Sequence, residues 1–273
     1  MSNAAAFFDL DKTIIAKSST LAFGRPLYVG GLINRRIMLK AAYAQFVYLL
    51  TGADTEQMDR MRGELTALVT GWDARQVREI VAETLHEVVQ PLVFAEAAAL
   101  IQRHKLAGDD VVIVSSSGEE IVEPVGQLLG ADAVIATRMV LDGHGRYTGE
   151  IGFYCYGEHK ATAIRELAAA RGWDLAACYA YSDSVTDVPL LSAVGHPTAV
   201  NPDRALRRYA AEHGWPIRTF SRPVPLRSRL RPSPAVTGTA MGAAAAVGIA
   251  WYAARRRRLP SGGDIRDPFA SGS

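Results

Sequence analysis

The stretch Ala4-Ala-Ala-Phe-Phe-Asp9-Leu-Asp11-Lys-Thr13 determines which fold this 273-residue chain can adopt. Its apolar run stops at Asp9, which is typical of a buried parallel strand that ends in a polar loop. Asp110-Val-Val-Ile-Val-Ser115 repeats the pattern, and Cys178-Tyr-Ala-Tyr-Ser182 repeats it again before Asp183. Helical patterns separate these runs. The sequence therefore predicts an α/β fold with a parallel sheet between two layers of helices.

Further elements complete this three-layer α/β/α core. Met139 to Ile151 is two short strands around an Asp-Gly turn, which is the signal of a β-hairpin. A helix is expected after Ser115 and should end at Gly130, where glycine can close it. We also expect helices over 94–106, 160–171, 187–194 and 203–212, and strands over 133–136, 198–200 and 217–220.

A long segment without a strand pattern separates the first two strands. Its apolar residues recur at helical spacing in 32–50, 55–68 and 74–89, and Asp54 and Asp73 are suited to cap two of these helices. The sequence therefore predicts three parts: a catalytic core of 1–15 and 93–221, a helical cap of 16–92 over the strand ends, and a C-terminal tail of 222–273.

Polar residues gather where ligands bind in such a fold, outside the carboxyl ends of the strands. They are Asp9, Asp11, Ser115, Lys160 and the segment Asp183-Ser-Val-Thr-Asp187. Several carboxylates close together need a cation, and hard oxygen ligands suit Mg²⁺. The serine supplies a hydroxyl donor and the lysine a positive charge for a phosphoryl group. Such a set can transfer a phosphoryl group by positioning and charge neutralisation.

In order and spacing, these motifs resemble the four motifs of the haloacid dehalogenase superfamily. The helical insert after the first strand resembles the subfamily with a helical cap (subfamily IB), which contains the phosphoserine phosphatases. The hairpin with Tyr147-Thr-Gly-Glu150 is similar to theirs. The resemblance covers roughly residues 4 to 220 and implies a Rossmann-like core.

The resemblance also implies a role for each site residue. Asp9 would attack phosphorus to form an aspartyl-phosphate, and Asp11 would protonate the leaving alcohol and then activate water. Asp9, the backbone carbonyl of Asp11, and Asp183 would hold Mg²⁺. The remaining implied roles are orientation of a metal-bound water or of Lys160 by Asp187, phosphate binding by Ser115 and Lys160, and shaping of the nucleophile loop by Thr13.

Two simpler interpretations compete with these roles. Ser116, the next hydroxyl along, could bind the phosphate in place of Ser115, which we prefer because it directly follows the apolar run. Lys160 could be an ordinary solvated lysine at the start of a helix. The fourth motif also departs from the family: Ser182 and Ser184 stand where Gly is more frequent, and Thr186 where many members have Asn.

A second departure bears on the substrate. Phosphoserine phosphatases place a Glu nine residues after the nucleophile, where it holds the substrate's amino group, and here that position is Ser18. A neutral hydroxyl pairs with an ammonium group less strongly than a carboxylate does. Arg25, Arg60 and Arg62 are the candidates for a cap arginine that binds the substrate carboxylate.

The expected function is magnesium-dependent hydrolysis of a small phosphomonoester, and phosphoserine is the best single candidate. One alternative is phosphotransfer to an alcohol, because an acceptor other than water can intercept the same intermediate. The other is a membrane-associated scaffold of the same fold without turnover. The intact pair of Asp9 and Asp11 argues against the scaffold, which needs neither.

Composition supports a cytoplasmic catalytic domain. The only cysteines, Cys155 and Cys178, form no metal motif, the N-terminus has no basic leader, and a net charge of +2 gives no reason to expect nucleic acid. Residues 235–254 carry no charge and are long enough for a transmembrane helix, next to the basic run 255–258. The tail therefore predicts membrane contact, and its Gly-x-x-x-Gly at 238–242 would allow a homodimer.

Overall fold

The computed structural model describes residues 3–33 and 66–221. The chain divides into two compact units, Met1–Leu226 and Arg227–Ser273, and all described residues belong to the first. Most of the two helices expected over 32–50 and 55–68 lies outside the described residues, as does the tail 222–273.

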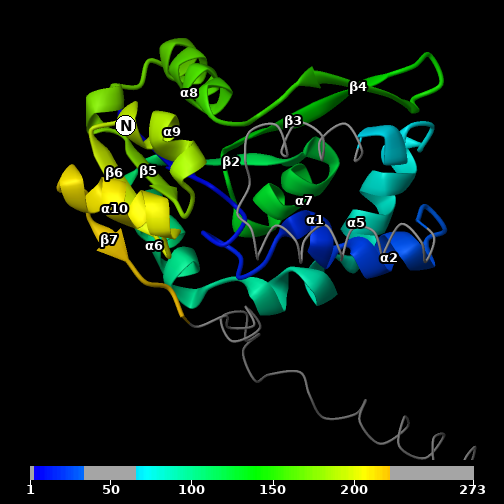
Figure 1. Cartoon of the computed structure of the whole chain (residues 1–273), viewed down its shortest axis with the longest axis horizontal. Helices are drawn as coiled ribbons and strands as arrows, with labels where there is room; N and C mark the ends of the chain where they lie inside the picture. The colour runs from blue at the N-terminus through cyan, green and yellow to red at the C-terminus, as the bar shows by residue number, and fades with distance from the viewer. Residues whose placement is uncertain (1–2, 34–65, 222–273) are drawn as a thin grey trace, which may run out of the picture. The chain divides into compact units, whose positions relative to one another are not determined.

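A seven-stranded sheet forms the centre of the first unit, in the order β4-β3-β2-β1-β5-β6-β7 (Figure 1). All neighbouring strands are parallel except β3 and β4, which form the antiparallel hairpin. The strands are β1 (Ala5–Phe8), β2 (Asp110–Gly118), β3 (Ala133–Leu141), β4 (Tyr147–Phe153), β5 (Tyr179–Ser182), β6 (His196–Val200) and β7 (Ile217–Arg218). The predicted α/β sheet is confirmed, with β2, β1 and β5 as neighbours at its centre.

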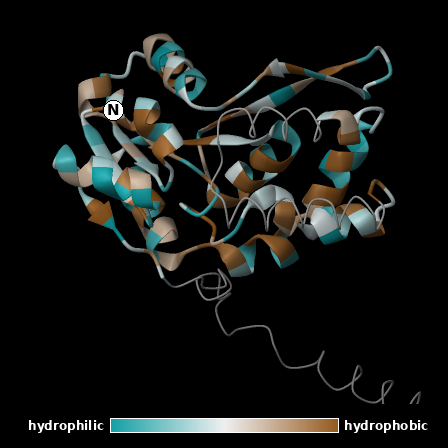
Figure 2. Ribbon diagram, in the orientation of Figure 1, coloured by the Kyte–Doolittle hydropathy of each residue, from teal (hydrophilic) through white to brown (hydrophobic). Residues whose placement is uncertain are grey.

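Helices cover both faces because side chains of β1 alternate between two hydrophobic clusters. Ala6 and Phe8 pack in a cluster with α5, α6 and α7, whereas Ala5 and Phe7 pack in a second with α8, α9 and α10. Figure 2 shows hydrophobic and hydrophilic stretches side by side on α5, α6 and α7. The helices are α1 (Ser19–Ala22), α2 (Gly24–Val29), α5 (Ala74–Val88), α6 (Ala95–Ala107), α7 (Glu119–Leu129), α8 (Glu158–Arg171), α9 (Val188–Ser192) and α10 (Arg204–Glu212), with 3₁₀ turns at Gln90–Leu92, Leu175–Ala177 and Val185–Asp187.

Helix α5 begins as the sequence predicts, with Asp73 as its N-cap. The Asp73 side chain accepts hydrogen bonds from the amides of Arg75 and Gln76. Val77, Val81 and Leu85 recur at intervals of four residues, so α5 buries one face in the same cluster as β1. This part of the predicted cap therefore shares a hydrophobic core with the sheet.

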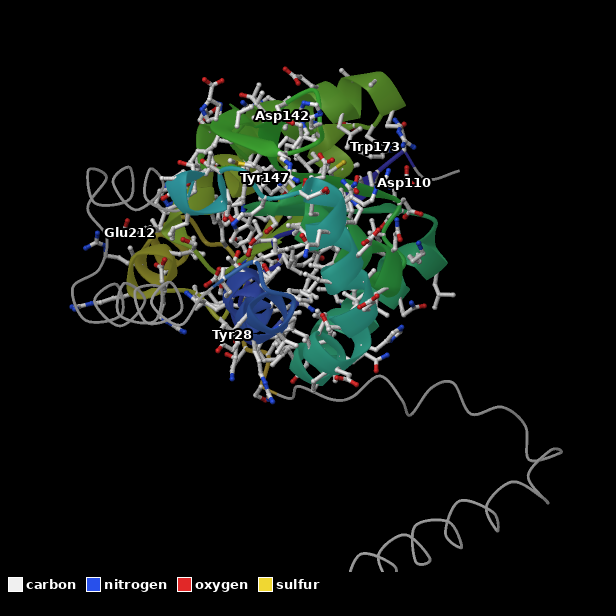
Figure 3. The ribbon with its side chains drawn as sticks, turned by 90° about the vertical axis from the view of Figure 1, so that its right-hand side faces the viewer. Tyr28, Asp110, Asp142, Tyr147, Trp173 and Glu212 are labelled. Atoms are coloured by element: carbon white, nitrogen blue, oxygen red, sulfur yellow. The ribbon has the colours of Figure 1, made fainter. Side chains whose placement is uncertain are left out.

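The hairpin of β3 and β4 contacts the insert through backbone hydrogen bonds. The amide of Gly71 donates to the carbonyl of Tyr147, and the amide of Tyr147 donates to the carbonyl of Trp72, at 2.8 and 2.9 Å. Arg146 adds a side-chain hydrogen bond to the carbonyl of Gly71 at 3.0 Å. Figure 3 looks onto this side of the molecule and labels Asp142 and Tyr147 of the hairpin.

Among the residues that the structure describes, no helix is both long and apolar enough to cross a bilayer. The candidate transmembrane segment 235–254 lies outside them.

Candidate active site

The loop after β1 holds Asp9 at the centre of the sheet. The amide of Asp9 donates to the carbonyl of Tyr181 on β5 at 2.9 Å, and its side chain is buried. The amides of Ile14 and Ile15 both donate to the carbonyl of Leu10 at 3.0 Å, which closes the loop tightly. Lys12, with φ of 62°, takes the left-handed conformation that the turn requires.

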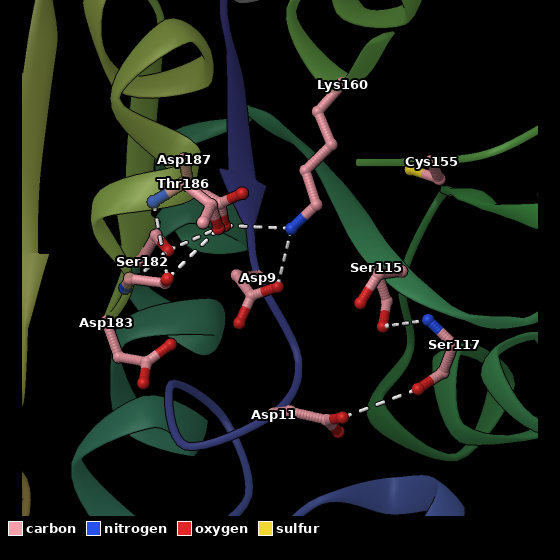
Figure 4. A network of polar contacts seen from close by, with 12 residues as sticks. Asp9, Asp11, Ser115, Ser117, Cys155, Lys160, Ser182, Asp183, Thr186 and Asp187 are labelled. Atoms are coloured by element: carbon pink, nitrogen blue, oxygen red, sulfur yellow. Dashed lines mark hydrogen bonds and ion pairs between the residues drawn. The ribbon is translucent and has the colours of Figure 1, made fainter. Parts of the chain in front are cut away.

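Lys160 joins two carboxylates from separate segments, one in the loop after β1 and one in the 3₁₀ turn Val185–Asp187. It lies in the first turn of α8, is 2% exposed, and places Nζ 2.8 Å from Asp9 Oδ1 and 2.8 Å from Asp187 Oδ2 (Figure 4). It is therefore not a solvated lysine at a helix start. Asp9 precedes Lys160 by 151 residues and Asp187 follows it by 27, yet the three side chains form one buried ion-pair cluster.

The two carboxylate oxygens of Asp187 differ in their hydrogen bonding. Oδ2 accepts from Lys160 and also from the hydroxyl of Ser182, at 2.7 Å. Oδ1 is buried and makes no hydrogen bond with the residues that the structure describes. A buried carboxylate oxygen without a donor costs free energy unless a cation or an ordered water satisfies it.

Burial and mutual repulsion disfavour the charges of this cluster. Burial raises the pKa of Asp9 to about 8, although Lys160 opposes the shift. Burial also raises the pKa of Asp183 to about 7, with Lys12 opposing it and Asp187 adding to it. Burial alone would lower the pKa of Lys160, but Asp187 and Asp9 reverse this, and it is raised. The cluster has more negative than positive charge, which an added cation would correct.

Asp183 lies beside the cluster, directly after β5. Its side chain is buried, and Lys12 Nζ approaches Oδ2 to 3.9 Å. The described residues contain no group of three or more His, Cys, Asp and Glu side chains that could together hold a metal ion. Two carboxylates and a backbone carbonyl still fit Mg²⁺, because this ion takes few protein ligands and keeps several waters or phosphate oxygens.

Asp11 points away from the lysine cluster. Its Oδ1 accepts from the amide of Ser19 at 2.8 Å, and its Oδ2 accepts from the hydroxyl of Ser117 at 3.4 Å. Figure 4 shows the Asp11 side chain directed toward Ser117 and not toward Asp9. Burial raises the pKa of Asp11, and the hydrogen bonds from Ser19 and Ser117 oppose the shift. A carboxyl group that holds a proton is suited to act as a general acid.

An irregularity at the end of β2 arranges the three neighbouring serines. Ser115 pairs with Ala136 but Gly118 pairs with Thr137, so two residues of β2 bulge out of the ladder. Ser115 and Ser117 are buried, with the Ser117 amide donating to Ser115 Oγ at 3.2 Å, whereas Ser116 is exposed. Burial beside the cluster favours Ser115 over Ser116 as the phosphate ligand.

The structure brings together Asp9, Lys160 and Asp187, with Asp183 and Ser115 beside them. Thr13 is buried in the loop after β1, and its hydroxyl has no partner among the described residues. Ser18 is the half-buried N-cap of α1, and Arg25 is exposed on α2. Arg60 and Arg62 lie outside the described residues.

Sequence reasoning missed two hydroxyl groups of the site, those of Ser182 and Ser117. Ser182 was noted only as a departure from the family, yet its hydroxyl binds Asp187. Ser117 follows the predicted end of a strand, and no local signal indicated that a bulge would turn it toward Asp11.

The sequence is similar to a known family and to several named proteins. A family model described as haloacid dehalogenase-like hydrolase matches residues 6–192. The "Inhibition of morphological differentiation protein" of Streptomyces azureus is 62% identical over 260 residues, which cover 93% of this chain and 94% of that protein. A Mycobacterium tuberculosis protein named a probable phosphatase is 62% identical over 250 residues, which cover 92% of this chain and 86% of that protein.

More distant relatives carry names with two different substrates. A phosphoserine phosphatase of Mycobacterium tuberculosis is 38% identical over 89% of this chain and 80% of its own length. A histidinol-phosphatase of Neisseria meningitidis is 33% identical over 79% of this chain and 98% of its own length. A crystal structure from Bordetella pertussis, described as a protein with unknown function, has a TM-score of 0.69 and 27% identity, and the match covers 80% of this chain and 98% of that one. The chain belongs to the haloacid dehalogenase-like hydrolase family.

Proposed function

We propose that this protein is a magnesium-dependent phosphatase that hydrolyses a small phosphomonoester through an aspartyl-phosphate on Asp9. The observation that carries the proposal is the buried Nζ of Lys160, which lies 2.8 Å from both Asp9 Oδ1 and Asp187 Oδ2. Burying a lysine in this way is expensive unless it serves the charges around it. A cation between the nucleophile and a second carboxylate is suited to hold a phosphoryl group against the nucleophile.

The chain's own residues perform the reaction in two steps. A carboxylate oxygen of Asp9 bonds to phosphorus as the bond from phosphorus to the alcohol oxygen breaks, and Asp11 gives its proton to that oxygen. Water then bonds to phosphorus, Asp11 takes a proton from it, and the bond from Asp9 to phosphorus breaks to release phosphate. Lys160 and Ser115 bind the phosphoryl oxygens, and Asp187 keeps the lysine charged and in place.

Asp9, Asp183 and the backbone carbonyl of Asp11 are the groups that would hold Mg²⁺. When bound, the ion supplies positive charge to the phosphoryl oxygens and to the carboxylates. The free, buried Oδ1 of Asp187 fits this assignment as an acceptor for water around the ion.

The names of the relatives do not agree on a substrate, and Ser18 argues against tight binding of an ammonium group. We therefore propose phosphoserine as the first compound to test but expect it to be a moderate substrate. Other small alcohol phosphates, including those with an amine but no carboxylate, belong in the same screen. A tail that contacts a membrane, a cytoplasmic active site and a homodimer remain proposals from the sequence.

The test is a screen of phosphorylated amino acids, sugars and lipids, with phosphate release measured with Mg²⁺ and with excess EDTA. We expect turnover that requires the metal and returns when Mg²⁺ is restored. Trapping of ³²P from a labelled substrate on wild-type protein, and not on Asp9→Asn, would support the covalent step. Full activity in EDTA, or unchanged activity of Asp9→Asn, would refute the proposal.

A further inference from the structure

We propose that Ser117 is a positioning residue that aligns Asp11 for proton transfer to the leaving group. This inference rests on the proposed phosphatase activity and on the role of Asp11 as its general acid. It assigns a function to a hydroxyl that lies two residues beyond the phosphate-binding Ser115.

The hydroxyl of Ser117 is the centre of a small hydrogen-bonded cluster. It donates to Asp11 Oδ2 at 3.4 Å, lies 2.8 Å from Ser19 Oγ and lies 3.3 Å from Thr20 Oγ1. Both neighbouring hydroxyls belong to α1, at the start of the insert, whereas Ser117 belongs to the sheet. Ser117 therefore connects the general acid, the sheet and the insert.

The backbone fixes where this hydroxyl lies. Ser117 lies in the bulge between Ser115 and Gly118, its side chain is buried, and its amide donates to Ser115 Oγ at 3.2 Å. A direct hydrogen bond therefore links Ser115, the proposed phosphate ligand, to Ser117, which contacts the proposed general acid.

Two donors bind the two oxygens of Asp11. The amide of Ser19 binds Oδ1 and the hydroxyl of Ser117 binds Oδ2. When Asp11 passes its proton to the alcohol oxygen, the ionised carboxylate remains, and both donors stabilise it. Proline would remove the amide of Ser19 but would also constrain the backbone, whereas alanine removes the hydroxyl of Ser117 alone, so Ser117 is the group on which the idea can be tested.

A general acid matters most when the leaving oxygen is strongly basic. We therefore propose to measure kcat/KM, which covers events up to release of the alcohol, for a series of substituted phenyl phosphates and alkyl phosphates. Ser117→Ala should lose about tenfold on alkyl phosphates, the effect of removing one hydrogen bond to a charged group, and little on 4-nitrophenyl phosphate. A plot of log kcat/KM against leaving-group pKa should become steeper. A residue that only maintains the fold would lower all the values equally.

Three further variants make the result decisive. Ser117→Thr keeps the hydroxyl and should restore the wild-type slope, and Ser116→Ala removes an exposed neighbouring hydroxyl and should leave the slope unchanged. In an Asp11→Asn background, Ser117→Ala should have no further effect, because the two residues act together. Parallel lines for wild type and Ser117→Ala, with wild type active, would overturn the role of Ser117 alone. A wild type inactive on every phosphomonoester would overturn the proposed function as well.

Discussion

Asp9 and Asp11 are two residues apart, yet their surroundings give them different chemistry. Asp9 is paired with the buried ammonium of Lys160, whereas Asp11 accepts hydrogen bonds from two neutral groups, the amide of Ser19 and the hydroxyl of Ser117. Burial raises the pKa of both carboxyl groups; Lys160 opposes the rise at Asp9, and the hydrogen bonds from Ser19 and Ser117 oppose the rise at Asp11. In the proposed mechanism, these different surroundings would separate the roles of nucleophile and general acid between two residues of the same type.

This division predicts different losses from two similar substitutions. Asp9→Asn removes the attacking oxygen and should reduce turnover below detection, while Asp11→Asn should slow it by roughly two to four orders of magnitude. Steady-state phosphate release with Mg²⁺ measures both. The control is Asp142→Asn at the exposed hairpin turn, which should retain full activity. Equal, modest losses in Asp9→Asn and Asp11→Asn would contradict the assignment.

The raised pKa of Asp9 also predicts a dependence of stability on pH. Burial raises this pKa from 3.8 to about 8, so between these values the folded state binds more protons than the unfolded state. The contribution of Asp9 to the free energy of unfolding therefore falls as the pH rises through that window. In EDTA, Asp9→Asn should become steadily more stable relative to wild type from about pH 5 to about pH 8, as measured by urea unfolding.

The same Asp142→Asn variant is the control for pH. Backbone hydrogen bonds from Arg146 and His144 lower the pKa of Asp142, so its contribution changes only in more acidic solution. The difference in the free energy of unfolding between Asp142→Asn and wild type should stay constant from about pH 5 to about pH 8. Added Mg²⁺ should bind the protein with Asp9 ionised. It should therefore weaken the pH dependence of the stability difference between Asp9→Asn and wild type. A flat difference between Asp9→Asn and wild type in EDTA would show that Asp9 is ionised throughout.

Ser18 yields a prediction about the substrate. It is the half-buried N-cap of α1, directly before the residue whose amide binds Asp11. If its side chain faces the leaving group, Ser18→Glu should improve kcat/KM for phosphoserine and for no phosphomonoester without an amine. Ser18→Gln, similar in size but neutral, should give no such gain. A wild type that strongly prefers phosphoserine to all other substrates would mean that another residue holds the amino group.

At the scale of elements, hydrophobic patterning predicted nearly every strand and helix of the core. The apolar runs before Asp9, Ser115 and Asp183 are β1, β2 and β5, and the glycines at 108 and 130 end α6 and α7 in the left-handed conformation. Such signals are local, because the apolar run of a buried strand and the glycine that ends a helix both lie within or directly beside the element that they predict. The polar residues at the strand ends were predicted for the same reason.

Contacts between distant segments could not be predicted in this way. Helices α1 and α2 are too short to show a period, and Ser19 and Ser117 meet across 98 residues of sequence. The apolar run of β2 stops at Val114 and three serines follow it. The sequence therefore predicts that the strand ends at Ser115, whereas β2 continues through the bulge to Gly118. Hydroxyl groups carry no periodic signal, and their roles depend on tertiary packing.

One close approach between elements predicts a large cost for a single methyl group. A Cβ at Gly195, just before β6, would collide with the backbone carbonyl of Ala176, which cannot rotate away. Gly195→Ala should lower the free energy of unfolding by about 1–3 kcal/mol, the usual cost of overpacking. Gly143→Ala, in the hairpin turn, meets nothing within 4 Å and should be neutral or slightly stabilising. Equal urea midpoints for the two variants would contradict the packing of β6 against the 3₁₀ turn Leu175–Ala177.

At the scale of the whole molecule, the site joins parts that the sequence separates widely. Asp9 precedes the insert, whereas Lys160, Asp183 and Asp187 follow it. Backbone hydrogen bonds from 71–74 attach the insert to the hairpin. The start of the insert also contacts the acid through Ser19. Through these two attachments the insert reaches both the hairpin and Asp11, so in the proposed mechanism it is suited to place a substrate beside Asp11.

The C-terminal tail is the remaining part of the molecule, and the sequence alone supports its prediction. Residues 235–254 are uncharged, with Trp251 and Tyr252 next to four arginines, as at a membrane interface. Their many Ala and Gly residues gain little free energy in hydrocarbon, so anionic lipid could instead bind the arginines alone. We expect full-length protein to stay with membranes through high-salt and alkaline washes, and a version ending at Ser221 to be soluble and active. Release by salt alone would reduce the tail to a surface contact, and recovery of full-length protein in the soluble fraction would exclude the anchor.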